Sequence, residues 1–513
     1  MSLNLATMLT ETAKKNPHHG AIIFENFKMS YGELHAATNK VANALVRAGV
    51  ERGQKVAILI PNIPQFLLCY FGILKAGAVV VPLNVLLRGP EVAYHLQDSD
   101  SVMLIAWEGF AADAIAGYQQ APNCQRLVII NAPGSTTVPD VEGAISFDAF
   151  LVDTSHTFEM VATMPDDTAV IIYTSGTTGR PKGAELTHFN LLFNARISAT
   201  TLGIEWFPDD VALVALPLFH SFGLSAVMGV MVTVGATMTL LPRFDPVKAF
   251  EIIQRDHVTA FSGVPTMYIY MLNHPARKQY DLSSLRFCNS GGASLPVEIL
   301  DAWKREFDIT ILEGYGLSET SPVASSNVLY KPAKPGTVGL PIWGIEMKIV
   351  DEQDHDLPVG EVGEIVIRGH NIMKGYYKRP EATAEAIHDG WFHSGDIGKM
   401  DEDGFFSIVD RKKDMIIRGG FNVYPRELEE VLYGHPAVAE AAVIGIPNAQ
   451  MGEEVKAIIY LKPGATATEE DIHAYCKERL AGYKYPRIIQ FIDQPLPKNA
   501  TGKVLKRELR EMA

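Results

Sequence analysis

Several signatures of known protein classes are missing from this sequence of 513 residues. The four cysteines, Cys69, Cys124, Cys288 and Cys476, are scattered, with neither a CxxC pair nor the spacing of metal ligands. Such usage is typical of free, mostly buried thiols in a reducing compartment. The N-terminal segment MSLNLATMLTETAKKNP has no apolar signal core, so we expect no secretion and a cytoplasmic location.

Positive charge is also scarce. The chain has 45 Lys and Arg against 59 Asp and Glu, a net charge of −14, and no run of basic residues. Because nucleic-acid binders carry a basic patch, we expect no nucleic acid among the partners. A polyanionic ligand such as a nucleotide would have to be held by local donors, since the global field opposes it.

One stretch, from Val211 to Pro242, contains no charged side chain and is long enough to span a bilayer. Pro217, Gly223, Gly229 and Gly235 interrupt it, however. A buried strand–helix–strand unit explains this pattern better, so we predict no transmembrane segment. No amphipathic anchor stands out, and the sequence leaves weak peripheral membrane contact and a homodimer open.

The chain is too long for one core, and its 47% apolar and 20% charged residues suit a soluble globular protein of at least two domains. Over the first ~330 residues, strand-like runs alternate with amphipathic helix-like runs, which predicts an α/β fold with largely parallel sheets. Strands are expected at 56–60, 78–82, 168–174 and 258–264. Helices are expected after the capping box of Ser30 and Glu33, over 65–75, and from the N-cap Asp245 with Pro246.

The texture changes after about Pro335, where short strands separated by Gly, Pro and Asp predict a small antiparallel barrel or sheet. From about Arg411 a compact α+β module follows, with helices expected near 425–433, 468–480 and 503–511. The charged stretch DRKKD (410–414) is the candidate boundary. We therefore predict an N-terminal domain over 1–410, made of two α/β subdomains and a small β-barrel subdomain, and a small α+β domain over 411–513.

The most informative segment is YTSGTTGRPKG, from Tyr173 to Gly183, placed after a strand and before a helix near Thr187. Its small residues allow close backbone approach to a polyphosphate, hydroxyl and N–H groups supply donors, and Lys182 adds positive charge. The Walker pattern GxxxxGK[ST] is absent. This segment therefore predicts a phosphate-binding loop of another type.

That string resembles the phosphate loop of the acyl-adenylate-forming superfamily, which contains acyl-CoA synthetases, peptide-synthetase adenylation domains and luciferases. Further segments resemble the family's other signatures in order along nearly the whole chain: NSGGASLP (289–296), ILEGYGLSET (311–320), GWFHSGD (390–396) and PKNATGKVLKREL (497–509). The fatty-acyl-CoA synthetase branch is the most similar. The resemblance implies ATP, Mg²⁺ and coenzyme A as cofactor and co-substrates and a mobile C-terminal domain.

Site residues follow from the resemblance position by position. Tyr315 would stack on adenine, Thr320 would contact the α-phosphate, Glu319 would bind Mg²⁺, and Asp396 and Arg411 would hold the ribose. The implied nucleotide and CoA set is Thr174, Ser175, Gly176, Thr177, Thr178, Gly179, Lys182, Gly292, Ala293, Glu313, Gly314, Tyr315, Gly316, Thr320, Asp396, Arg411, Lys413, Gly419, Gly420 and Lys503. The implied acyl set is Phe219, His220, Phe222, Gly223, Val264, Met267 and Gly291. Lys182, His220, Thr320 and Lys503 would be catalytic.

Lys503 has a separate role in the implied mechanism. It would bridge the acyl carboxylate and the α-phosphate during adenylation, where a cation offsets developing negative charge. The same position obstructs the path of CoA, so the small domain would rotate about a hinge at Lys413. Gly419 and Gly420 would then turn toward CoA.

Three other functions are compatible with parts of the sequence. An amino-acid adenylation domain would carry an aspartate where this chain has Phe219-His220-Ser221, and a carrier domain usually follows it. A luciferase-like oxygenase shares most of the signatures. A pseudoenzyme would not need Lys182, Glu319, Asp396, Arg411 and Lys503 together. For the acid itself, we expect a medium- or long-chain fatty acid and keep an aryl acid of the coumarate or benzoate kind as the alternative.

Overall fold

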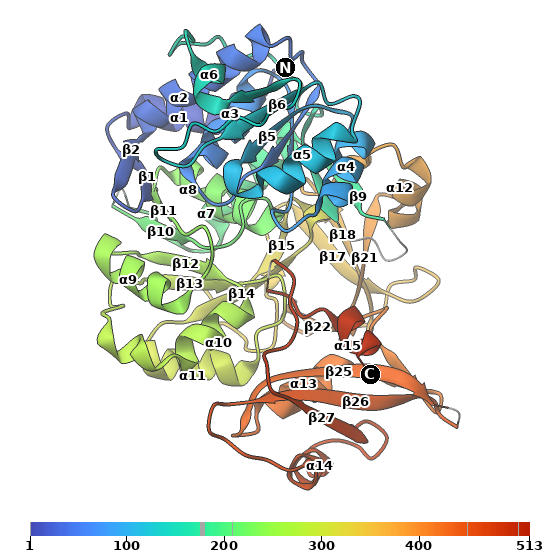
Figure 1. Ribbon diagram of the computed structural model, residues 1–513. Helices are drawn as coiled ribbons and strands as arrows, with labels where there is room; N and C mark the ends of the chain where they lie inside the picture. Colours follow the sequence, from blue (N-terminus) through green and yellow to red (C-terminus); the bar gives the residue numbers. More distant parts are fainter. Residues whose placement is uncertain (1, 175–179, 208, 449, 501, 513) are drawn as a thin grey trace.

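The computed structural model describes residues 2–174, 180–207, 209–448, 450–500 and 502–512. These residues form two large, mostly parallel sheets, a smaller antiparallel sheet and a C-terminal α+β module (Figure 1). The expected α/β class is confirmed. No helix within the described ranges is both long and apolar enough to cross a membrane.

The first large sheet has nine strands and is parallel through its centre, with antiparallel strands at both ends. In spatial order these are β16 (Leu340–Pro341), β15 (Val323–Ser326), β14 (Ile311–Gly316), β13 (Phe287–Ser290), β12 (Ala260–Gly263), β10 (Val211–Val214), β11 (Thr237–Leu240), β1 (Gly20–Phe24) and β2 (Phe27–Ser30).

The second large sheet has eight strands. In spatial order these are β19 (Gly375–Tyr376), β9 (Lys182–Thr187), β8 (Thr168–Thr174), β4 (Val79–Pro82), β3 (Lys55–Leu59), β5 (Ser101–Trp107), β6 (Arg126–Ile130) and β7 (Ala144–Ser146). In β3, Val56 and Ile58 enter one core while Ala57 and Leu59 enter another. Because side chains alternate across a strand, burial on both faces explains the continuous apolar run.

Helices cover both faces of these sheets. The larger core joins both sheets through α1 (Thr7–Lys15), α2 (Tyr31–Arg47), α3 (Pro64–Lys75), α7 (His188–Thr201) and α8 (Val230–Val234). The outer core of the eight-stranded sheet is closed by α4 (Gly89–Asp98) and α5 (Ala111–Gln119), and α6 (Phe147–Leu151) contacts β6. The nine-stranded sheet also contacts α9 (Pro246–Asp256), α10 (Pro265–Asn273) and α11 (Val297–Phe307).

The helix caps expected from the sequence are present. Ser30 Oγ accepts a hydrogen bond from Glu33 N at 3.3 Å, while Glu33 Oε2 accepts one from Ser30 N at 2.8 Å. Asp245 Oδ1 accepts from Lys248 N at 2.9 Å, with Pro246 as the first residue of α9. These bonds satisfy backbone donors that have no partner inside the helix.

The uncharged stretch from Val211 to Pro242 folds as the expected strand–helix–strand unit. Between β10 and β11 lie a π-helix, η2 (Phe222–Gly229), and α8, which continues directly from it. Gly235, with φ +82°, ends α8. The unit is therefore interior to the fold, and its buried surroundings account for the missing charge.

The phosphate-loop segment differs from the expected strand–loop–helix order. Strand β9, which was not expected, follows the loop and pairs antiparallel with β8. Helix α7 begins at His188 with Thr187 as its N-cap, close to the expected start. The segment thus connects two strands of a hairpin, because the residues after Pro181 find a partner in β8. The predicted nucleotide residues Ser175, Gly176, Thr177, Thr178 and Gly179 lie outside the described residues.

After the large sheets comes the expected antiparallel sheet. Its strands are β17 (Ile345–Val350), β18 (Gly363–Gly369), β20 (Ile387–His388), β21 (Trp391–Met400) and β22 (Phe406–Arg411), with α12 (Pro380–Ala386) leading into β20. The predicted domain boundary at 410/411 falls at the end of β22.

The C-terminal module packs below the rest of the molecule in Figure 1. Its strands are β23 (Ile416–Arg418), β24 (Phe421–Val423), β25 (Val438–Asn448), β26 (Gly452–Leu461) and β27 (Ile488–Ile492), and its helices are α13 (Pro425–Tyr433), α14 (Glu469–Lys477) and α15 (Lys506–Glu511). The helix expected over 503–511 begins three residues later, because the residues before it continue toward the large sheets. All four cysteines are free and buried, as expected.

Candidate active site

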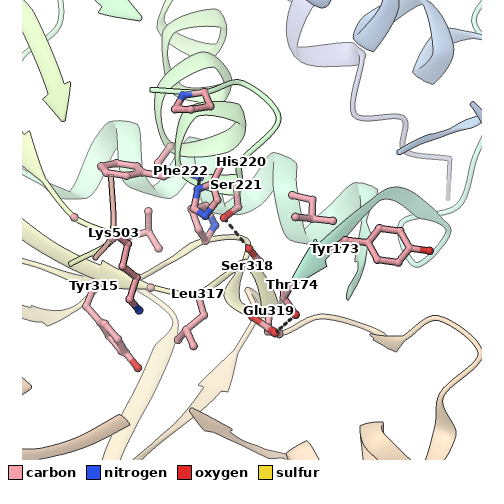
Figure 2. Close-up of a pocket in the computed structure, with 18 of the residues that line it drawn as sticks. Tyr173, Thr174, His220, Ser221, Phe222, Tyr315, Leu317, Ser318, Glu319 and Lys503 are labelled. Atoms are coloured by element: carbon pink, nitrogen blue, oxygen red, sulfur yellow. Dashed lines mark hydrogen bonds between the residues drawn. The ribbon is translucent and has the colours of Figure 1, made fainter. Parts of the chain in front are cut away.

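One cavity of about 1330 Å³ lies where the two large sheets, the antiparallel sheet and the end of the chain meet. It brings together most of the site residues predicted from the sequence. The predicted residues that line it are Thr174, Lys182, Phe219, His220, Phe222, Val264, Gly291, Gly292, Gly314, Tyr315, Gly316, Glu319, Arg411, Lys413 and Lys503. In Figure 2, Lys503 and Tyr315 lie on one side, Thr174 and Glu319 on the other, and His220 and Ser318 between them.

The remaining predicted residues that the structure describes do not line this cavity. They are Gly223, Met267, Ala293, Glu313, Thr320, Asp396, Gly419 and Gly420. The Thr320 hydroxyl is used inside its own turn, where it accepts from Leu317 N at 2.8 Å and donates to Pro322 O. Glu313 is buried behind the wall, where loss of hydration raises its pKa to about 7.

Gly316 shows why this wall of the cavity is built from small residues. A Cβ at this position would lie 1.8 Å from Pro322 O, a backbone atom that cannot move aside. Gly292 has φ +79°, a backbone conformation that residues other than glycine rarely adopt. The backbone itself therefore forms the surface on which a ligand would rest.

Glu319, the predicted Mg²⁺ ligand, lines the cavity on the same side as Thr174 (Figure 2). It lies in the short helix η4 (Ser318–Thr320) and is 8% exposed. Thr174 Oγ1 donates to its Oε1 at 3.1 Å, and Tyr376 OH donates to the same oxygen at 3.0 Å. Lys182 Nζ lies 5.3 Å from the centre of the Tyr376 ring. Among the described residues none donates to Oε2, so this carboxylate retains an oxygen for a metal ion.

Tyr315 and Arg411 line the other side of the cavity, and both contact the buried Asp396. Tyr315 OH donates to Asp396 Oδ2 at 2.7 Å, and Arg411 Nε lies 3.1 Å from Asp396 Oδ1. Asp396 is 3% exposed, so these two contacts fix a buried carboxylate. The predicted ribose residues Asp396 and Arg411 are thus paired, on neighbouring strands β21 and β22.

Lys503 reaches the cavity on a turn that packs against the large domain. A Cβ on Gly502 would lie 2.8 Å from Val264, and φ at Gly502 is +78°. Burial, with the positive charges of Arg411 and Lys413, lowers the pKa of Lys503 to about 8. Neighbouring positive charges disfavour the protonated lysine, so a bound anion would favour its charged form.

His220 lies between this lysine and Glu319 in Figure 2. Its burial and the charge of Lys503 lower its pKa to about 4, so the imidazole is neutral at physiological pH. Its Nδ1 accepts from Phe222 N at 3.3 Å. The next residue, Ser221, shares a hydrogen bond of 3.2 Å with Ser318, which ties this loop to η4 (Figure 2). A neutral His220 leaves Lys503 as the cation of this pair.

A second lysine connects the C-terminal module to the large domain. Lys498 Nζ donates to Tyr270 OH at 2.8 Å and to both oxygens of Glu440, at 2.7 and 2.8 Å. Tyr270 belongs to α10 and Glu440 to β25. This contact holds the orientation in which Lys503 faces the cavity. Sequence reasoning missed Tyr270, Lys498 and Tyr376, since none of them carries a signal that separates it from an ordinary surface or core residue.

An apolar arm extends from His220 into the large domain. It runs between α7, η2 and α8 on one side and the face of β10, β12 and β13 on the other. Its apolar lining is Leu202, Ile204, Trp206, Ala212, Leu213, Leu216, Val227, Val230, Met231, Ala260, Val264 and Phe287. Ser198, Ser262 and Asn289 are polar exceptions. The cavity thus combines this apolar part of its lining with a polar part that carries Lys182, Arg411, Lys413 and Lys503.

Comparison with known proteins agrees with this architecture. The family model named AMP-binding enzyme matches residues 9–377, and that named AMP-binding enzyme C-terminal domain matches residues 427–503. The chain belongs to the AMP-binding enzyme family. A long-chain-fatty-acid–CoA ligase of Bacillus subtilis is 39% identical to this AMP-binding enzyme, over 99% of the chain and 94% of the relative. A feruloyl-CoA synthase of an Amycolatopsis species is 38% identical, over 97% and 96%.

Solved structures give the same result. The anthranilate CoA ligase AuaEII in complex with anthranoyl-AMP has a TM-score of 0.94 and 31% identity, covering 100% of this chain and 97% of its own. ATP-bound MatB from Rhodopseudomonas palustris has a TM-score of 0.91 and 34% identity, covering 100% and 99%. This AMP-binding enzyme is therefore an adenylate-forming acyl-CoA ligase, a class that uses ATP, Mg²⁺ and CoA.

Proposed function

We propose that this acyl-CoA ligase activates a medium- or long-chain fatty acid. The observation that carries the proposal is the apolar arm, which opens from His220 and is lined mainly by aliphatic and aromatic side chains. An alkyl chain gains about 0.8 kcal/mol for each CH₂ group that it buries, so an apolar lining favours an acid with an alkyl chain. The close fatty-acid-activating relative supports the same choice.

The reaction has two steps. A carboxylate oxygen of the acid attacks the α-phosphorus of ATP, which forms acyl-AMP and releases pyrophosphate. The thiol of CoA then loses its proton and its sulfur attacks the acyl carbon, which forms the thioester and releases AMP. The first step replaces oxide, a poor leaving group of the free acid, by AMP, which is a good one. Both steps depend mainly on positioning and charge stabilisation.

The chain's residues have separate roles in this proposal. Lys503 bridges the carboxylate and the α-phosphate, and Lys182 neutralises the outer phosphates. Asp396 and Arg411 hold the ribose, and Tyr315 supports the adenine. Mg²⁺ on Glu319 would neutralise phosphate charge and orient the departing pyrophosphate. Neutral His220 lies at the mouth of the apolar arm, where it orients the carboxylate without repelling Lys503.

A second candidate substrate is a hydroxylated or methoxylated aryl acid. Asn289 Oδ1 and Ser198 Oγ are buried, and neither has a hydrogen-bond partner among the described residues. Both line the arm near Trp206 and Phe287, whose rings could contact an aromatic acid. Because an unpaired buried polar group costs free energy, these atoms favour a ligand with a polar substituent.

The proposal is tested by pyrophosphate release that depends on both CoA and acid. Straight-chain acids of two to eighteen carbons are compared with cinnamates and benzoates. We expect the highest kcat/KM among the medium and long straight-chain acids. Turnover with aryl acids alone would contradict the fatty-acid proposal and support the second candidate.

The variant Asn289→Leu separates the two candidates further. It replaces the amide by an apolar side chain of similar size. If alkyl chains occupy the arm, their kcat/KM should stay unchanged or rise, because the unpaired amide is removed. For hydroxycinnamates that bond to the amide, kcat/KM should fall by about tenfold. Ser262, its neighbour on β12, is the matched control position.

The domain boundary, the location and the assembly also remain proposals. We propose that residues 1–410 and 411–513 are separate domains with a hinge at Lys413. A cytoplasmic location, weak peripheral membrane contact and a homodimer are sequence-based predictions for which fractionation and sedimentation are the direct measurements.

A further inference from the structure

Two histidines and an aspartate cluster at the edge of the cavity, in a region that the proposed reaction does not use. Asp354 lies in the turn between β17 and β18, His388 is in β20, and His393 is in β21. His388 Nδ1 lies 3.6 Å from Asp354 Oδ2, and His393 Nε2 lies 3.8 Å from Asp354 Oδ1. One ligand atom from each of the three lies within 4.8 Å of the others.

These distances suit a small divalent ion. In a tetrahedral zinc site with bonds of about 2.0–2.1 Å, neighbouring ligand atoms lie about 3.3 Å apart. The two carboxylate contacts exceed that separation by a few tenths of an ångström and use different oxygens of Asp354. The carboxylate would therefore turn and the two imidazoles would close in when an ion binds. His388 and Asp354 are partly exposed, with side-chain exposures of 44% and 54%, so an ion could reach them from solvent.

A fourth residue lies on the side of His393 where a carboxylate commonly supports a metal-bound histidine. His393 Nδ1, on the far side of the ring from Asp354, lies 3.7 Å from Glu364 Oε1. Glu364 is itself held, because its Oε1 accepts from Gly395 N at 3.0 Å. A carboxylate behind a ligating imidazole fixes the ring's orientation and increases its basicity. His393 is 13% exposed, so its ring is already positioned by the fold.

The cluster is separate from the predicted Mg²⁺ position. Glu319 lies in η4, the short helix between β14 and β15 of the nine-stranded sheet. Asp354, His388 and His393 all belong to the antiparallel sheet and its turns. The donor types also differ. Mg²⁺ prefers oxygen ligands, while two imidazoles and one carboxylate are typical of zinc and similar borderline ions.

We propose that Asp354, His388 and His393 form a binding site for a zinc-type divalent ion, with Glu364 orienting His393 and solvent supplying the remaining ligand. The ion connects the turn at residues 351–356 to the β20–β21 hairpin. Both segments line the cavity, and Asp396 lies three residues beyond His393 on the same strand. The bound ion would therefore stabilise the part of the antiparallel sheet that contains the proposed ribose residues Asp396 and Arg411.

The test uses the full chain without an affinity tag, freed of metal by chelation and kept in excess Mg²⁺. Zn²⁺ binding is followed by calorimetry, and Co²⁺ binding by visible absorption. We expect one equivalent of each ion and a tetrahedral Co²⁺ spectrum. The variants His388→Ala and Asp354→Asn should each weaken binding at least tenfold, and Glu364→Gln by about 10–100-fold in the same direction.

The matched control is His355→Ala. This histidine follows Asp354 in the same turn, and its nearest carboxylate is Asp351, outside the cluster. Its removal should leave Zn²⁺ and Co²⁺ affinity unchanged. Thermal unfolding of each metal-free variant checks that it folds. Added Zn²⁺ should raise the Tm of the parent and of His355→Ala, but not the Tm of the other variants. Binding that is absent, that survives His388→Ala, or that is lost equally in His355→Ala would overturn the proposal.

Discussion

The Glu319 carboxylate shows how one side chain can be held in place and still offer an oxygen to a ligand. Thr174 and Tyr376 both donate to its Oε1. The fixed geometry means that a metal ion at Oε2 would find its ligand already oriented, which lowers the cost of binding.

Replacing Glu319 by Gln should raise the Mg²⁺ concentration for half-maximal pyrophosphate release by about 10–100-fold, since a charged ligand becomes neutral. Tyr376→Phe is the matched control, because it removes only one hydrogen bond to the carboxylate. Its effect should be about fivefold. A Glu319→Gln enzyme with the parent's Mg²⁺ dependence would show that the ion is held elsewhere.

Lys503 gives a second prediction at this scale. With a pKa of about 8 it is protonated below that pH and loses its charge above it. Because the protonated form stabilises the developing negative charge, kcat/KM for adenylation should fall as pH rises through about 8. His220, with a pKa of about 4, should add no change near neutrality.

The measurement is acid-dependent pyrophosphate release in the free-enzyme regime between pH 6 and 10. In Lys503→Arg the remaining activity should lose this basic limb, since arginine stays protonated over the range. A limb near the ordinary lysine value of 10.5, or none, would mean that the lysine is not desolvated by its neighbours.

Side chains that belong to a recognisable string could be selected from the sequence as candidates for one site. Tyr315 and Lys503 came from such strings, and both line the cavity. Tyr376, in contrast, is one of two adjacent tyrosines in a charge-rich stretch, and only the β9–β19 pairing brings it to Glu319. Thr320 also belongs to a recognisable string, but it does not line the cavity, and its hydroxyl forms hydrogen bonds inside its own turn.

Among the elements, α10 and β25 are joined by a contact between the large domain and the C-terminal module. Tyr270 on α10 accepts a hydrogen bond from Lys498, and Lys498 also pairs with Glu440 on β25. Lys498 keeps its carboxylate partner if the tyrosine hydroxyl is lost. The contact is therefore a test of orientation that leaves the module's own fold intact.

Tyr270→Phe should weaken the adenylating orientation by about 1 kcal/mol, the usual worth of one hydrogen bond, and slow adenylation about fivefold. Thioester formation from supplied acyl-AMP should be unchanged or faster. Stopped-flow rates of the two half-reactions provide the measurement. Equal slowing of both would indicate a local packing defect and not a change in orientation.

Element prediction followed local physics closely. The capped helices α2 and α9 and the apolar strands of the large sheets could be predicted because their signals lie in neighbouring residues. Strand β9 could not, since Lys182–Thr187 becomes a strand only through its pairing with β8. Its sequence, KGAELT, has little strand preference of its own.

At the scale of the whole molecule, the structure holds one of the two orientations that the proposed mechanism needs. Lys503 lines the cavity, while Gly419 and Gly420, on the β23–β24 hairpin, do not. Both glycines have positive φ, +57° and +82°. For CoA to reach the acyl-AMP, the module must rotate so that this hairpin replaces Lys503, with Lys413 as the proposed hinge.

The most direct test of this account is Lys503→Ala assayed in each half-reaction separately. Adenylation, measured as acid-dependent pyrophosphate release, should fall by about 10²–10³-fold or more, because the cation at the reacting phosphate is lost. Thioester formation from supplied acyl-AMP and CoA should stay within about twofold of the parent, because Lys503 leaves the site for that step. An equal loss in both half-reactions would contradict the two-orientation mechanism.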